Sequence, residues 1–341
     1  MALFRRRSGG DGSSGRSGWG FGRAARSKQV PTLDPTLGDP RLGELLRLAE
    51  AAVAGGAAGW AALRAELAAL DDQADLTRVI DLVTDTEGLE RTLDAALAAD
   101  PADALTLLVS GARQVAWAWE ARTGARAQHV SEEQWKLFGE RLEKAEEQLL
   151  EVAEREPGWL APWYFLQVSG RGASLGHDVV RARFDAAVRR YPFHRASYTQ
   201  QLQQTCRKWG GSHEQMHAFA RSSMLAAPVG SRLAELVVLA HLEHWLDLEP
   251  GEDSRYLSSR QVVADLREAY ERSVGHPGYQ REPGWQGAHN TFAMALAMVG
   301  EKFYARRLFE ELDDAVTEFP WQYLDRDPVA AFTRLRDSCA R

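Results

Sequence analysis

Cysteine and long apolar runs are both scarce in this sequence, and each shortage excludes a class of protein. The two cysteines, Cys206 and Cys339, provide neither a disulfide framework nor the spacing of a metal-binding set, which favours a reducing compartment. A membrane span needs about 18 uninterrupted apolar residues, and no stretch of this sequence reaches that length. No apolar run follows the arginines near the N-terminus to complete an export signal. We therefore expect a cytoplasmic location.

Runs of β-branched residues and several motifs of known enzymes are equally lacking. From Pro40 onward Ala, Leu, Glu and Arg dominate at helical spacing. The short run Val79–Val83 is the one exception, and it is itself compatible with a helix. The chain contains no Gly-rich phosphate loop, nucleophile elbow or kinase signature. We therefore expect an all-α fold, no cofactor and a role that is not enzymatic.

Charge is distributed unevenly along the chain. Residues 1–30 hold seven Lys/Arg and one Asp, so the net charge of −7 for the whole chain leaves −13 on the remainder. Residues 1–38 are rich in Gly, Ser, Arg and Pro and lack periodicity. This composition predicts a disordered basic tail that can be removed without loss of stability. Residues 39–341 are expected to form one acidic domain that does not bind nucleic acid.

An internal repeat organises the middle of the chain. Apolar residues and a proline recur at offsets of 0, 4 and 12 residues. Near the C-terminus Ala305 and Phe309 begin a similar set, but Pro320 comes three residues late. The last three prolines of the regular sets are 35 and 36 residues apart, while a longer insert follows Pro101, and this period predicts stacked helical hairpins. The four regular sets are Leu89, Leu93, Pro101; Ala145, Leu149, Pro157; Val180, Phe184, Pro192; and Met216, Ala220, Pro228.

This pattern resembles the tetratricopeptide repeat, a helix–turn–helix unit of about 34 residues. The resemblance covers residues 85–320 and implies a solenoid of stacked antiparallel helix hairpins. Such a solenoid would act as a protein-binding scaffold or adaptor and hold a peptide or a partner helix on its concave face. The best match contains Phe292, Leu296, Gly300, Tyr304, Ala305 and Phe309. The turn Lys208–Ser212, with Phe319-Pro320-Trp321, is also similar to an uncharacterised bacterial family of helical-repeat proteins.

One short segment reads most simply as a turn followed by a helix start. Gly210 and Gly211 are expected to end one helix, because glycine reaches the positive φ angles of a tight reversal. Ser212 is expected to cap the next helix, with Gln215 three residues later completing a capping box. We assign Gly210, Gly211 and Ser212 a structural role.

The same segment offers an alternative function, that of a zinc-dependent hydrolase. His213 and His217 enclose a His-Glu-x-x-His pattern, in which two histidines bind zinc and the glutamate is the general base. The third ligand would come from downstream, where Glu235, His241, Glu243 and His244 are available, and Glu235 is the one we assign. We favour the structural interpretation, because His213 would be the first residue of its helix and no strand-rich segment is present to hold a substrate. We therefore expect Glu235 and His241 to lie too far away, and His241 and His244 to be surface histidines.

Tryptophan is abundant, with 11 residues. Most are expected to fill gaps between repeats, while some form an aromatic groove for a partner. Trp117 and Trp119 are two residues apart and cannot share a helix face, so one packs and the other lines a surface. We assign Trp117, Trp163 and Trp209 as candidate partner-binding residues. Asn290 is added because it lies one residue before the position where some tetratricopeptide domains bind a C-terminal carboxylate. The expected partner is an unidentified protein or peptide.

Overall fold

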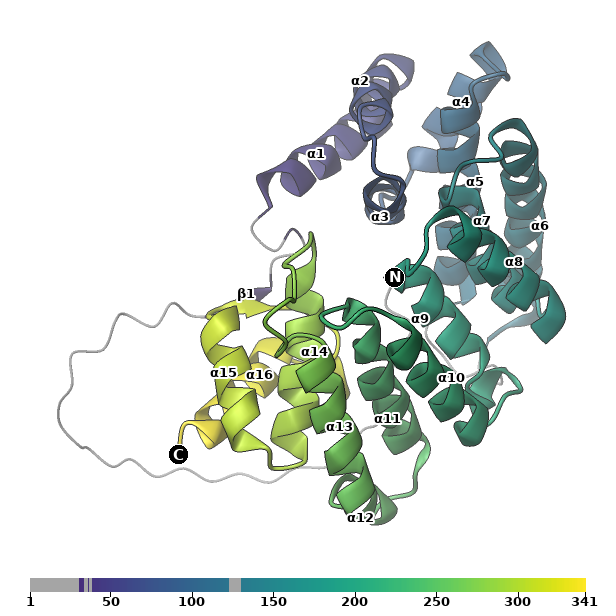
Figure 1. Ribbon diagram of the computed structural model, residues 1–341. Helices are drawn as coiled ribbons and strands as arrows, with labels where there is room; N and C mark the ends of the chain where they lie inside the picture. Colours follow the sequence, from purple (N-terminus) through teal and green to yellow (C-terminus); the bar gives the residue numbers. More distant parts are fainter. Residues whose placement is uncertain (1–30, 34–35, 37–38, 123–129) are drawn as a thin grey trace. The chain divides into compact units, whose positions relative to one another are not determined.

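Helices make up nearly all the secondary structure of the chain. The structure is a computed structural model that describes residues 31–33, 36, 39–122 and 130–341 (Figure 1). Among these residues, strands are limited to the pair β1 (Thr32–Leu33) and β2 (Ala315–Val316). The predicted all-α fold is confirmed. The chain divides into two compact units, unit 1 (Gly38–Pro283) and a second unit that includes Gly284–Arg341.

Unit 1 is an array of antiparallel helices joined by short turns. Short 3-10 turns, Arg207–Trp209 and Arg232–Ala234, precede α10 and α11. The helices are α1 (Pro40–Gly55), α2 (Ala57–Ala68), α3 (Gln73–Val83), α4 (Leu89–Ala99), α5 (Ala104–Arg122), α6 (Glu132–Arg155), α7 (Ala161–Gly172), α8 (His177–Arg190), α9 (Arg195–Gln204), α10 (His213–Ala226), α11 (Glu235–Asp247), α12 (Glu252–Leu257) and α13 (Arg260–Arg272).

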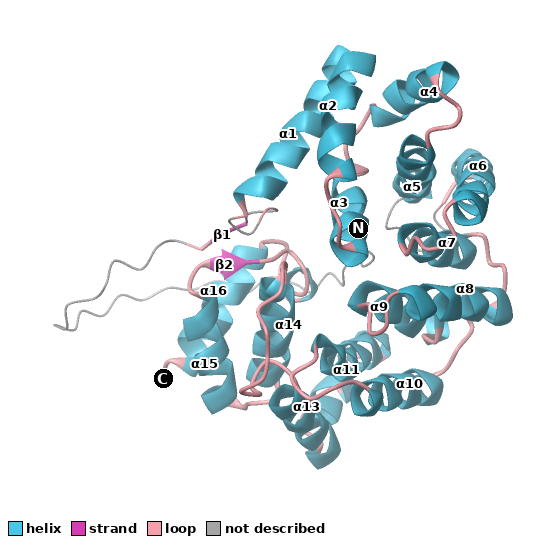
Figure 2. Ribbon diagram, turned by 45° about the horizontal axis from the view of Figure 1, so that its top comes forward, coloured by secondary structure: helices cyan, strands magenta, loops and turns pink. Residues whose placement is uncertain are grey.

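The helices of unit 1 stack as successive hairpins. Each helix packs on its sequence neighbour in the pairs α5 with α6, α7 with α8, α9 with α10 and α11 with α13. The first helices of these hairpins also pack on one another, α5 on α7, α7 on α9 and α9 on α11. Figure 2 shows these first helices following one another in one row and α6, α8 and α10 in a second row. We call the row of α5, α7, α9 and α11 the inner row.

The repeat predicted from the sequence lies on the other helix of each hairpin and on α4. The two apolar members of every regular set are buried, as Leu89 and Leu93 are on α4. Each of these helices ends two residues before the proline of its set, for example α6 at Arg155 before Pro157. The proline cannot continue a helix, so the spacing marks where each of these helices ends. The predicted helical repeat is therefore present in unit 1.

The turn before α10 follows the structural interpretation, with one correction. Gly210 has a φ of +88°, a conformation that suits glycine. Gly211 has no positive φ; it is needed because an added Cβ would lie 2.0 Å from the carbonyl oxygen of Thr205. The Ser212 side chain accepts the backbone N–H of Gln215 at 3.1 Å, which confirms the predicted N-cap.

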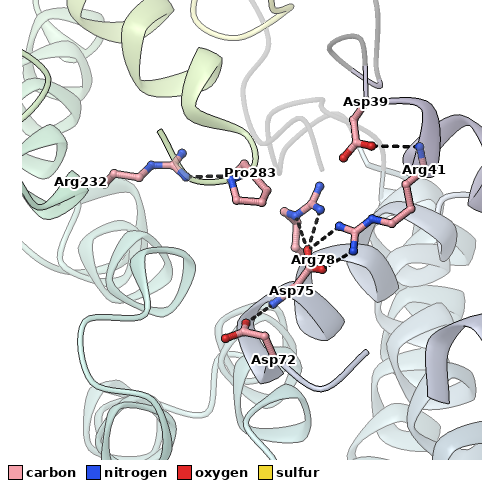
Figure 3. A network of polar contacts seen from close by, with 7 residues as sticks. All are labelled: Asp39, Arg41, Asp72, Asp75, Arg78, Arg232 and Pro283. Atoms are coloured by element: carbon pink, nitrogen blue, oxygen red, sulfur yellow. Dashed lines mark hydrogen bonds and ion pairs between the residues drawn. The ribbon is translucent and has the colours of Figure 1, made fainter. Parts of the chain in front are cut away.

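The start of unit 1 is held by ion pairs between α1 and α3. The carboxylate of Asp75 accepts hydrogen bonds from Arg41 on α1, at 2.7 and 3.0 Å, and from Arg78 on its own helix at 2.7 Å (Figure 3). Asp72 caps α3 by accepting the backbone N–H of Asp75. This network fixes the angle at which the first helix meets the array.

The second unit contains α14 (Trp285–Met298), α15 (Lys302–Leu312), a 3-10 turn (Trp321–Tyr323) and α16 (Pro328–Cys339). Its core is aromatic, with Trp321 and Phe332 rings 5.2 Å apart. Strand β1 pairs in parallel with β2, although the sequence predicts disorder for residues 1–38. The rest of that predicted tail, apart from Pro31, Thr36 and the strand, lies outside the described residues.

Candidate functional site

Four histidines meet where α10 packs on α11, and we call them the histidine cluster. His213 and His217 lie one turn apart on α10, and His241 and His244 lie one turn apart on α11. Because the two helices are antiparallel, His213 stacks on His244 with ring centroids 3.8 Å apart and planes 8° from parallel. The rings of His217 and His241 lie 4.7 Å apart.

Hydrogen bonds connect the cluster to a tyrosine on α12. His217 Nε2 lies 3.1 Å from His244 Nδ1, so the two nitrogens share one hydrogen when both rings are neutral. The hydroxyl of Tyr256 is 2.6 Å from His241 Nδ1 and 3.4 Å from His217 Nε2. One ring of α11 and one of α10 therefore meet around this hydroxyl.

Carboxylates stand at both ends of the cluster. Asp247 lies 3.0 Å from His213 Nε2, and Asp265 of α13 lies 3.4 Å from His241 Nε2. Burial, followed by the charges of the neighbouring histidines, lowers the pKa of His217 to about 3 and that of His244 to about 4. Both rings are consequently neutral at pH 7, with lone pairs available to accept a hydrogen bond or bind a metal.

A cavity of about 290 Å³ opens beside the cluster. His217, His241 and His244 line one side of it, and Tyr256 and Asp265 line another. Its remaining lining includes apolar side chains of α10, α11 and α13 together with Arg221. The cavity has room for water or a small ligand next to the histidine nitrogens.

The zinc set proposed from the sequence is not assembled. Glu235 is 1% exposed, and its carboxylate pairs with Arg195 at 2.7 and 2.9 Å. Within the described residues, no three His, Cys, Asp or Glu side chains are grouped to hold a metal ion. Two expectations were wrong, however: His241 lies against His217, and it is 5% exposed rather than a surface residue. The antiparallel register of α10 and α11 causes both differences.

The tryptophans assigned to partner binding lie on different parts of unit 1. Trp117 is half-buried beneath the guanidinium of Arg141, 3.6 Å from its ring centroid, while Trp119 is buried. Trp163 is half-buried on α7, with Arg190 at 4.8 Å. Trp209 is half-buried with its ring 5.9 Å from that of Trp119. Only Trp163 and Trp209 flank the polar side chains described next.

Asn290, in the second unit, does not lie at a surface. It is 0% exposed, and its Oδ1 accepts the indole N–H of Trp321 at 2.6 Å. Its amide N–H groups donate to the carbonyls of Gln286 and Ala315. Since its amide is used inside the fold, we withdraw Asn290 as a partner-binding candidate.

A group of buried polar side chains lies on the inner row and was missed by the sequence reasoning. On α7, Trp163, Gln167 and Arg171 follow one another at intervals of four residues and so share one face. On the neighbouring α9, the run Gln200-Gln201-Leu202-Gln203-Gln204 is buried throughout. The glutamine run was the available signal, because glutamine is mostly exposed in folded proteins. We call Trp163, Gln167, Arg171, Gln200, Gln201 and Gln204 the inner polar row.

Arg171 is the most unusual member of the inner polar row. It is 1% exposed, and among the described residues no carboxylate forms an ion pair with it. Its Nη1 donates to Gln200 Oε1 at 2.6 Å, and its guanidinium lies 5.7 and 5.5 Å from the rings of Trp119 and Trp209. Burial lowers the pKa of Arg171 to about 10. Its Nε and Nη2 have no hydrogen-bond partner in the described part of the chain.

Comparison with known proteins does not assign this chain to a family. No family model, curated protein or solved structure matches the chain. The class of protein defined by the fold is therefore an all-α protein built from packed helical hairpins. None of the helices in the described ranges is long and apolar enough to cross a membrane.

Proposed function

We propose that this protein is a non-catalytic scaffold that binds an extended peptide segment of a partner protein along the inner polar row. The observation that carries the proposal is the set of buried polar atoms there without a partner. They are the donors Trp163 Nε1, Arg171 Nε and Arg171 Nη2, and the acceptors Gln167 Oε1, Gln201 Oε1 and Gln204 Oε1. Buried polar groups are nearly always satisfied, so each of these atoms calls for water or a ligand.

The mixture of donors and acceptors favours a peptide main chain over a simple anion. An extended peptide presents N–H and C=O groups in alternation, and each kind needs its complement. An anion would satisfy only the donors and would leave the glutamine oxygens unpaired. Arg171 adds a charge-assisted donor for a carbonyl or carboxylate oxygen of the peptide.

Two half-buried tryptophans stand beside the buried side chains of the inner polar row. Trp163 begins the row on α7, and Trp209 lies beside Arg171 toward the end of that helix. Flat aromatic side chains with one polar group contribute strongly at protein interfaces. In this proposal they contact side chains of the bound peptide while the inner polar row binds its backbone.

Three further features belong to the same proposal. The hairpins are tetratricopeptide-like repeats, an assignment supported by the buried pairs and the prolines that follow each helix. The chain acts in the cytoplasm, as its low cysteine content favours. The folded units do not bind nucleic acid, because residues 31–341 carry net negative charge.

A selection experiment tests the proposal. The full chain is used to select peptides from a random library displayed on phage, and an enriched peptide is measured by fluorescence polarisation. Arg171→Met and Gln204→Leu are expected to weaken binding by about tenfold or more, since each removes a buried hydrogen bond. Arg181→Met on the exposed side of α8 is the matched control and should leave affinity unchanged. Failure to enrich any peptide, or equal affinity for Arg171→Met, contradicts the proposal.

A further inference from the structure

We propose that the histidine cluster binds one divalent transition-metal ion through His217 Nε2 and His244 Nδ1, with the Tyr256 oxygen in a third position. The ion is of the class that prefers imidazole, such as Zn²⁺, Cu²⁺ or Ni²⁺. This donor set differs from the zinc-protease pattern, since it uses one histidine of α10 and one of α11. Its third donor is a phenol oxygen rather than a carboxylate.

The spacing of the donor atoms fits a shared ion. Two nitrogens that each lie about 2.05 Å from zinc are separated by about 3.3 Å at a tetrahedral angle and by about 2.9 Å at a right angle. His217 Nε2 and His244 Nδ1 are 3.1 Å apart, between these limits. The Tyr256 oxygen is 3.4 Å from His217 Nε2, slightly more than the tetrahedral spacing.

The surroundings provide the outer contacts that metal ligands usually have. His241 lies behind Tyr256, with Nδ1 2.6 Å from the hydroxyl and Nε2 3.4 Å from Asp265. On the other side His213 stacks on His244, and Asp247 holds His213 at 3.0 Å. Such partners orient ligands and raise metal affinity.

Space also permits metal binding. The adjoining cavity of about 290 Å³ leaves a position open for water or a further ligand. A hydrogen-bonded cluster without metal is the competing account, and it predicts no stoichiometric binding.

The test uses the full chain, freed of any histidine tag and dialysed against a chelator. Zn²⁺ is titrated by calorimetry, and Co²⁺ by the visible absorbance that appears when it leaves its octahedral water shell. One equivalent of each ion is expected to bind. His217→Ala and His244→Ala should each weaken binding by at least about a hundredfold. Tyr256→Phe and His241→Ala should weaken it by about tenfold to a hundredfold.

His177→Ala is the matched control, because His177 is exposed and lies outside the cluster. It should leave both the stoichiometry and the affinity unchanged. Circular dichroism checks the fold of every variant, and His→Gln replaces any alanine variant that unfolds. The proposal is overturned if no saturable binding occurs, if the Co²⁺ spectrum stays that of the aqueous ion, or if the His217 and His244 variants bind as tightly as the control.

Discussion

Two buried arginines of unit 1 should respond in opposite ways to replacement by methionine. Arg113 is 0% exposed and bonds Glu90 at 3.0 Å, Glu120 at 2.5 Å and the carbonyl of Thr84 at 2.8 Å. Arg171 is 1% exposed and has a single short bond, to a neutral glutamine. Methionine fills a similar volume without carrying a charge. The difference between the two variants therefore reports how well each guanidinium is paired in the wild type.

The magnitudes follow from the partners. Arg113→Met leaves the buried carboxylate of Glu90 unpaired and should cost about 3–5 kcal/mol. For Arg171, the fall in pKa from 12.5 to about 10 corresponds to about 3 kcal/mol of strain in the charged form. Arg171→Met removes this cost of burying a charge. It also removes the hydrogen bond to Gln200 and the contacts with two indole rings, which together are worth about 2–4 kcal/mol. Arg171→Met should therefore remain within about 1 kcal/mol of the wild type.

Urea unfolding followed by circular dichroism measures both free energies of unfolding. If Arg171→Met loses 3 kcal/mol or more, Arg171 is a structural residue, and its unpaired nitrogens give no support to peptide binding. If it loses little while peptide affinity falls, the side chain is retained for binding at no gain in stability.

Three other predictions concern single positions. Ser212→Ala should lower the free energy of unfolding by about 1 kcal/mol, because it removes the α10 cap. Gly211→Val should lower it further, because the added Cβ meets the Thr205 carbonyl. Thermal unfolding ranks the two variants. Burial, and then the charge of a neighbouring arginine, lowers the pKa of His194 to about 4. The contribution of this residue to the free energy of unfolding is therefore complete above about pH 6.5 and is lost as the pH falls towards 4. The free energy of unfolding of His194→Asn, which keeps an N-cap, should fall by about 2 kcal/mol less than that of the wild type when the pH is lowered from 7 to 5. Equal decreases would contradict this assignment. Asn290→Leu should cost about 2 kcal/mol or more by leaving the Trp321 indole N–H unpaired, a loss that chemical denaturation can measure.

The helical architecture was predictable because its signals are local. Leu89, Leu93 and Pro101 mark a buried helix face and its end within 13 residues, and the later sets repeat that spacing. The Ser212 cap likewise depends on residues three apart. The strand at Thr32 was not predictable in the same way, since its partner at Ala315 is remote in sequence.

The candidate sites were less accessible, because they depend on how one helix is aligned with the next. His217 and His244 are 27 residues apart, and only the antiparallel register of α10 and α11 brings their nitrogens together. The same register keeps Glu235 away from them, paired with Arg195. Sequence periodicity tells which residues of a helix share a face but not which face of a neighbouring helix they meet.

The pairing of β1 with β2 has a consequence for the order in which the chain folds. The hairpins of unit 1 join residues that are near in sequence, so each can form soon after it leaves the ribosome. The second unit pairs Thr32 with Ala315, and in the sequence the residues of unit 1 lie between these two strands. Its sheet can close only after that intervening segment has been synthesised. Strand β1 therefore stays unpaired until every hairpin of unit 1 has been translated.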